Sequence, residues 1–199
     1  LILMAFFLLY FMGRLHPVNL GMFSAGFAGA SVEVVLLVAF QIVYGYVYSM
    51  VGIIVTVFMA GLAVGTYHRD KILPKVSLQV YYRLIWSMGG FILLIPLILT
   101  GIRYMSVHPF VLHSVFIILM FVTAMFTGMV FSLATQLRLQ KWITVASEVY
   151  SIDLLGAGLG TFAVSVYLIP LMGLMEVLVI TALWCLMSGL VARLRLGRG

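Results

Sequence analysis

The sequence has very few charged residues and almost no acidic ones. Only 8% of its 199 residues are charged and only 5 are Asp or Glu, whereas about a quarter of the residues in a soluble domain are charged. So little charge excludes an ordinary soluble domain, because the surface would have too few groups to face water. The single cysteine excludes an internal disulfide and a thiolate metal site, and we expect Cys185 to be a packing residue.

Apolar residues take the place of the missing charge, at 65% of the sequence and a mean hydropathy of +1.26. Runs long enough to cross ~30 Å of hydrocarbon as a helix lie at 20–44, 46–66, 78–101, 111–136, 145–169 and 173–193. A further run, 1–12, is too short, and we expect it to be the end of a helix whose beginning is missing. The predicted fold is all-α, a polytopic bundle of about six full transmembrane helices plus a partial N-terminal one, in a single transmembrane domain spanning 1–199.

The basic residues gather in alternate connections once these runs are threaded through a bilayer. One side receives Arg14, Arg69, Lys71, Lys75, Arg83, Arg138, Lys141, Arg193, Arg195 and Arg198. The other side receives only Arg103. Because cytoplasmic loops carry the excess of Lys and Arg, we expect an inner-membrane protein whose basic loops and C-terminus are cytoplasmic. The lipid bilayer is then the first partner, and the net charge of +6 does not indicate nucleic-acid binding.

Glu33 lies within the first full span, and its neighbours indicate which way it faces. Gly26 and Gly29 precede it by seven and four residues, and Gln41 follows eight residues later, so all share one helix face. A carboxylate inside a span costs several kcal/mol unless it is paired, protonated or hydrated, so we expect Glu33 to point into the bundle. Two interpretations stay open: a proton or cation site, or a hydrogen-bonded group that joins helices.

Two further acids, Glu148 and Asp153, are predicted as buried polar residues of the fifth span. They are about 140° apart around the helix, so we do not expect one carboxylate pair. Asp153 shares its face with glycines spaced for close helix packing. Glycines predicted to pack against other helices are Gly26, Gly29, Gly61, Gly65, Gly128, Gly156 and Gly160.

No catalytic motif stands out in the sequence. It has no HExxH pattern, no Ser-His-Asp arrangement and no thiolate cluster, so we predict no catalytic residue, metal or cofactor. His113 has no evident partner for haem ligation at its depth, and we expect it to be interfacial. The segment GAGLG at 156–160 lies in a predicted span without a preceding strand, so it indicates helix packing and not a dinucleotide loop.

Four stretches resemble the membrane domain of bacterial spermidine-synthase-like proteins, the fused multi-pass polyamine aminopropyltransferases. They are SAGFAGASVEVVLL (24–37), FMAGLAVGTYHRDKI (58–72), GMVFSLATQL (128–137) and VYSIDLLGAGLGTFAVSVYLIPLMGL (149–174). The resemblance implies a helical membrane module with Glu33 and Asp153 at the family's buried polar positions. The family's soluble catalytic domain has no counterpart in this sequence, so its activity does not carry over to this chain.

Three functions follow from these features. The first is a non-catalytic integral membrane subunit or anchor that assembles with other protein subunits in or at the bilayer. The second is a transporter of protons, cations or polyamines that uses the buried acids. The third is the membrane part of a spermidine-synthase-like enzyme whose catalytic domain is elsewhere. We rank them in this order from the sequence.

Overall fold

The computed structural model describes residues 16–45, 48–73, 75–104, 109–138 and 142–196, and every described element is a helix. The elements are α2 (Pro17–Tyr44), α3 (Tyr48–Ile72), α4 (Leu78–Tyr104), α5 (Pro109–Leu137), α6 (Trp142–Ala163), η1 (Val164–Leu168), α7 (Ile169–Met172) and α8 (Leu174–Leu196). The described part of the chain contains 6 helices that are long and apolar enough to cross a membrane. The predicted all-α bundle of six spans is therefore confirmed, whereas the run 1–12 lies outside the described residues.

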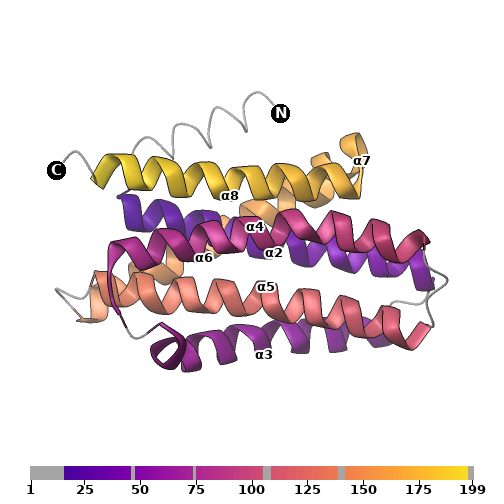
Figure 1. Ribbon diagram of the computed structural model, residues 1–199, viewed down its shortest axis with the longest axis horizontal. Coiled ribbons are helices and arrows are strands. Elements are labelled where there is room, and N and C mark those ends of the chain that lie inside the picture. Colours follow the sequence, from indigo (N-terminus) through magenta and orange to yellow (C-terminus); the bar gives the residue numbers. More distant parts are fainter. Residues whose placement is uncertain (1–15, 46–47, 74, 105–108, 139–141, 197–199) are drawn as a thin grey trace.

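The helices run alternately in opposite directions, so their ends form two groups (Figure 1). One group, which we call the basic end, holds the beginnings of α2, α4 and α6 and the ends of α3, α5 and α8. The basic side chains that the structure describes there belong to Arg69, Lys71, Lys75, Arg83, Arg138 and Arg193. At the opposite end the chain reverses at Gly45 and Gly173, whose φ angles of 69° and 99° lie in the region that glycine adopts without steric cost.

Several helices extend a few residues beyond their predicted ranges, and α3 does so by the most. The helix predicted over 46–66 continues as α3 to Ile72, so Asp70, which follows the predicted span, lies in a helix. The helix predicted over 145–169 begins at Trp142 and contains one wide turn, η1, where the N–H of Ile169 donates to the carbonyl of Val164. Pro170 follows directly and has no N–H to continue the regular ladder, which accounts for a wide turn at this place.

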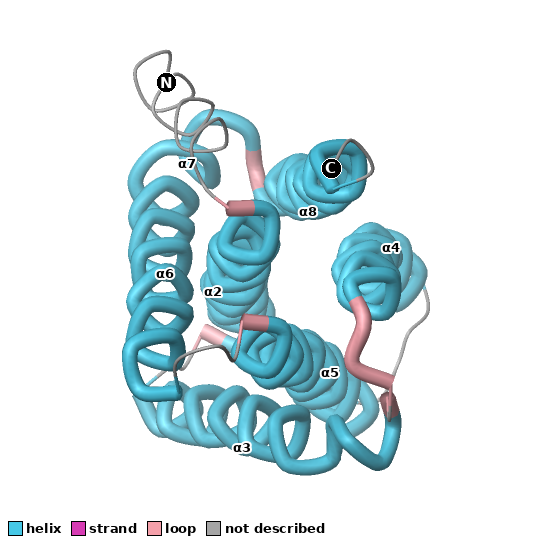
Figure 2. Tube along the Cα trace, turned by 90° about the vertical axis from the view of Figure 1, so that its left-hand side faces the viewer, coloured by secondary structure: helices cyan, strands magenta, loops and turns pink. Residues whose placement is uncertain are grey.

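Helix α2 forms the centre of the bundle (Figure 2). It packs chiefly on α6, α8 and α5, and α4 packs on α8 and α5. Helix α3 is peripheral, because nearly all of its contacts are with α5. This arrangement leaves α2 buried along most of its length, whereas most of α3 is exposed.

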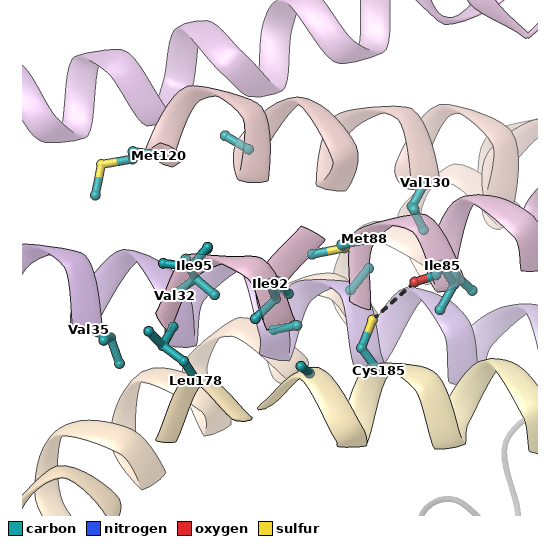
Figure 3. Close-up of a cluster of buried hydrophobic side chains, with 14 of the residues drawn as sticks. Val32, Val35, Ile85, Met88, Ile92, Ile95, Met120, Val130, Leu178 and Cys185 are labelled. Atoms are coloured by element: carbon teal, nitrogen blue, oxygen red, sulfur yellow. Dashed lines mark hydrogen bonds between the residues drawn. The ribbon is translucent and has the colours of Figure 1, made fainter. Parts of the chain in front are cut away.

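The core between α2, α4 and α8 is largely apolar. Val32, Ile92 and Leu178 are each at most 1% exposed and converge there (Figure 3). Cys185 is fully buried among them, and its thiol lies 3.6 Å from the carbonyl oxygen of Ile85. The cysteine therefore packs in the core, as its place in an apolar run predicts.

Candidate ion site in a polar seam along α2

Three positions on α2 lie nearly in line along the helix. Asn19, Gly26 and Glu33 are spaced by seven residues, and an ideal helix drifts by only ~20° over seven residues. Toward the basic end this line faces Asp153 and Glu148 on α6 and Arg138, the residue directly after α5. We call these six residues the polar seam.

The seam begins at the basic end with three residues that join three helices. Asn19, 4% exposed, donates from Nδ2 to Oε1 of Glu148 over 2.6 Å. Arg138, directly after α5, donates from Nη1 to Oδ1 of Asn19 over 2.5 Å and to Oε1 of Glu148 over 2.7 Å. Every pair in this triangle is thus within hydrogen-bonding distance, and it ties the start of α2 to the end of α5 and the start of α6.

The prediction that Glu148 is a buried acid is wrong. Its side chain is 44% exposed and is paired with Arg138, which is 24% exposed. The predicted run 145–169 placed Glu148 inside a span, whereas the apolar segment that crosses α6, η1 and α7 begins at Ser147, so Glu148 lies only one position inside it. The carboxylate of Glu148 is therefore both solvated and paired with Arg138.

Asp153 lies one and a half turns deeper and has no such partner. Its Oδ1 is buried and accepts no hydrogen bond from the part of the chain that the structure describes. The carboxylate lies against Gly26, since a Cβ built on this glycine would lie 2.5 Å from Oδ1 and 2.5 Å from the backbone oxygen of Asp153. Any larger residue at position 26 would collide with Asp153, so the glycine makes the room that the carboxylate occupies.

Glu33 continues the seam toward the opposite end. It is half-buried, and it has no hydrogen bond or ion pair within the described part of the chain. Its position lies about 10 Å beyond Gly26 along the axis of α2. Gln41 is half-buried as well, near the end of α2, and no hydrogen bond joins its side chain to Glu33.

The glycines named from the sequence lie where helix backbones approach most closely. Cβ atoms built on six of the seven would come within 2.6 Å of a backbone oxygen of a neighbouring helix: α6 for Gly26, α5 for Gly61 and Gly65, α3 for Gly128, and α2 for Gly156 and Gly160. Gly29 instead faces the hydroxyl of Thr127, at 2.7 Å. The seam is therefore flanked by tightly packed backbones on α2 and α6.

His16 is the N-cap residue of α2 and lies just outside the first apolar span, at the basic end. Burial lowers the pKa of His16 below the usual histidine value of 6.5, the positive charge of Arg138 lowers it further, and the negative charge of Glu148 opposes both effects. The neutral ring accepts a hydrogen bond at Nδ1 from the N–H of Val18 over 3.4 Å, and so begins α2. A protonated ring could not accept it.

Sequence reasoning did not predict the polar contacts of Asn19, Arg138 and Arg69. A signal for Asn19 was present in the sequence, since it precedes Gly26 by seven residues. No sequence signal distinguishes Arg138 from the other basic residues of its loop. Within the described ranges, no group of three or more His, Cys, Asp or Glu side chains could hold a metal ion.

Comparison of the chain with protein families, with curated proteins and with solved structures found no match. The resemblance to spermidine-synthase-like membrane domains therefore stays a prediction.

Proposed function

We propose that this chain binds and moves a small cation, with the proton as the simplest candidate, across the membrane in which it is embedded. The observation that carries the proposal is the carboxylate of Asp153, whose buried Oδ1 has no partner inside an apolar span. A carboxylate in such a place is costly unless it holds a proton or a cation. Asp153 is thus the proposed binding group.

Two neighbouring features support the proposal. Glu33 places a second half-buried carboxylate on the same line of α2, about 10 Å further from the basic end. At the basic end the Asn19, Arg138 and Glu148 triangle lies between Asp153 and the aqueous side. Acids at successive depths are typical of proton and cation pathways in membrane proteins, and this places transport ahead of the subunit function in our ranking.

A second candidate function, assembly as a membrane subunit with another protein, is favoured by one face of α3. Gly52, Thr56, Ala60 and Ala63 lie on the side of α3 that is turned away from α5, and all four are exposed. Small residues at this spacing allow another helix to approach closely. The opposite side of α3 uses glycines in the same way against α5.

The transport proposal is tested by reconstituting the purified chain in liposomes and measuring cation entry down an imposed gradient. A pH-sensitive dye reports protons, and radiolabelled Na⁺, K⁺ and a linear diamine serve as further substrates. We expect Asp153→Asn to lower the flux of the transported cation at least about tenfold, because the amide cannot ionise. Glu33→Gln should also lower it.

The matched control is Glu176→Gln, which removes an exposed acid of the first turn of α8, outside the seam, and should leave the flux unchanged. Wild-type flux equal to that of empty liposomes for all four cations would contradict transport. So would an unchanged flux in Asp153→Asn. Either result would leave the subunit function, with the exposed face of α3 as its interface, as the better proposal.

The orientation of the chain is part of the same proposal. We infer that the basic end faces the cytoplasm of a cell whose inner membrane holds the bundle, because Lys and Arg are retained on that side. The proposed cation path then runs between the Glu148 side in the cytoplasm and the Glu33 side outside.

A further inference from the structure

Arg69 is a charged side chain buried almost completely, with only 1% of its surface exposed. It lies in the last turn of α3 at the basic end and packs toward the end of α5. Its Nη1 donates to Oδ1 of Asp70 and to Oε1 of Gln136. The other two nitrogens, Nε and Nη2, are buried and have no hydrogen-bond partner among the described residues.

The two unpartnered nitrogens form one edge of the guanidinium group. Nε–H and an N–H of Nη2 point the same way, and this fork matches two oxygens of a phosphate or carboxylate. Leaving charged donors buried without acceptors costs more than the usual ~1–3 kcal/mol for a neutral group. The described residues therefore provide hydrogen-bond acceptors for Nη1 of Arg69 but none for Nε and Nη2.

The position of Arg69 along the span indicates what that acceptor is. The apolar span ends at Ile72, three residues beyond Arg69, which is about 4.5 Å along a helix axis. This is the depth at which lipid phosphates meet the hydrocarbon. Lys71 and Lys75 are exposed close by in the sequence, so the field at this end favours an anion.

The acidic neighbour does not occupy the free edge. Oδ1 of Asp70 accepts from Nη1 of Arg69 and, over 3.2 Å, from Nε2 of Gln136. Asp70 is itself 70% exposed, so much of its charge is screened by water. The same turn holds a second buried atom without a partner, Nδ1 of His68, which can donate when that nitrogen carries a proton.

We propose that the Nε and Nη2 edge of Arg69 binds a phosphate group at the basic end, between α3 and α5. The same chemistry is offered by the headgroup of an anionic phospholipid and by inorganic phosphate. Because the edge is covered in the protein as it stands, the side chains over it must move to admit the anion. Exchange should therefore be slow, and a bound lipid should survive purification. The site is independent of the proposed cation path.

Native mass spectrometry of the full purified chain tests the proposal with phosphatidylglycerol, phosphatidylcholine and inorganic phosphate as probes. We expect the wild type to bind phosphatidylglycerol about tenfold more tightly than phosphatidylcholine. Arg69→Gln should abolish this preference and Arg69→Lys should weaken it, because lysine keeps the charge but lacks the fork. Lys75→Gln removes the same charge from an exposed position and should change the preference less than about twofold.

The two sources of phosphate are separated by the same measurements. If millimolar inorganic phosphate raises the melting temperature of the wild type but not of Arg69→Gln, and phosphatidylglycerol has no advantage, the ligand is free phosphate. The proposal is overturned if the wild type prefers phosphatidylglycerol to phosphatidylcholine and Arg69→Gln keeps that preference. It is also overturned if neither phosphatidylglycerol nor inorganic phosphate raises the melting temperature of the wild type. This second test uses the wild type alone and so does not depend on whether a variant folds.

Discussion

Glu148 and Asp153 lie five residues apart on α6 but in opposite surroundings, because Asp153 lies deeper in the span. Glu148 is 44% exposed and bound to Arg138, so its charge is met by water and a cation. Asp153 has a buried oxygen with no partner and a backbone glycine in front of it. The same functional group is thus a structural ion pair at one position and a candidate ion ligand at the other. The flux measurements on Asp153→Asn and Glu33→Gln address the second role.

The protonation of His16 provides a prediction at the same scale. Burial and the charge of Arg138 hold the pKa of His16 below 6.5 in the folded protein, so folding favours the neutral ring. Its contribution to stability is complete above the unfolded pKa and is lost as the pH falls through 6.5 toward the folded value. We expect Arg138→Gln to raise the pKa of His16, though not fully to 6.5, because burial is the larger cause.

Histidine-selective NMR titration in detergent micelles measures this change. Lys71→Gln removes an exposed positive charge from α3 and should leave the titration midpoint of His16 where it is. An unchanged titration midpoint of His16 in Arg138→Gln would show that the charge of Arg138 does not act on the ring.

At the scale of helices, glycine decides which pairs approach closely. α3 has two faces lined with small residues, but only one of them touches another described helix. On that face a Cβ at Gly65 would lie 2.2 Å from the carbonyl oxygen of Met125, and one at Gly61 would lie 2.6 Å from that of Phe121. Backbone atoms cannot give way as a flexible side chain can, so the α3 and α5 axes would have to separate.

We expect Gly65→Ala to destabilise the bundle by ~1–3 kcal/mol, the usual cost of overpacking. Gly52→Ala is the matched control on the same helix, because a Cβ there meets nothing within 4 Å, and alanine is the better helix former by about 1 kcal/mol. Thermal unfolding in detergent, followed by circular dichroism, should show a lower melting temperature for Gly65→Ala and an equal or higher one for Gly52→Ala. Equal melting temperatures for the two variants would refute the close contact.

For the whole molecule, the sorting of charge between the two ends makes a prediction about its orientation. Cys185 is the single cysteine and is buried, so Cys185→Ala provides a background for labelling. In that background, Glu176→Cys should react with an impermeant maleimide from outside the cell. Lys75→Cys, at the basic end, should react only after the membrane is opened, because basic loops stay in the cytoplasm.

Both positions are exposed, so access to the reagent and not burial decides the result. Labelling of the two positions from the same side would mean that the spans are threaded wrongly. The depths assigned to Asp153, Glu33 and Arg69 would then have to be abandoned.

The sequence alone determined the class of this protein, the number of its spans and the end at which its basic side chains gather. These depend on hydropathy and charge summed along single segments of about 20 residues, so no knowledge of neighbours is needed. The glycine pattern also named positions that turn out to touch neighbouring helices, because close approach requires the smallest residue wherever it occurs. The exact ends of α3 and α6 were missed, since polar residues can extend a helix beyond its apolar run.

Only the tertiary structure decided which polar atoms have partners. Whether Glu148 is paired, Asp153 left unpartnered or Arg69 buried depends on the register of α6 against α2 and of α3 against α5. That register brings together atoms more than 60 residues apart, as in Arg69 and Gln136. A local pattern places an acid or a base on a face of its own helix, but the cost of its charge is set by what the neighbouring helix presents to it.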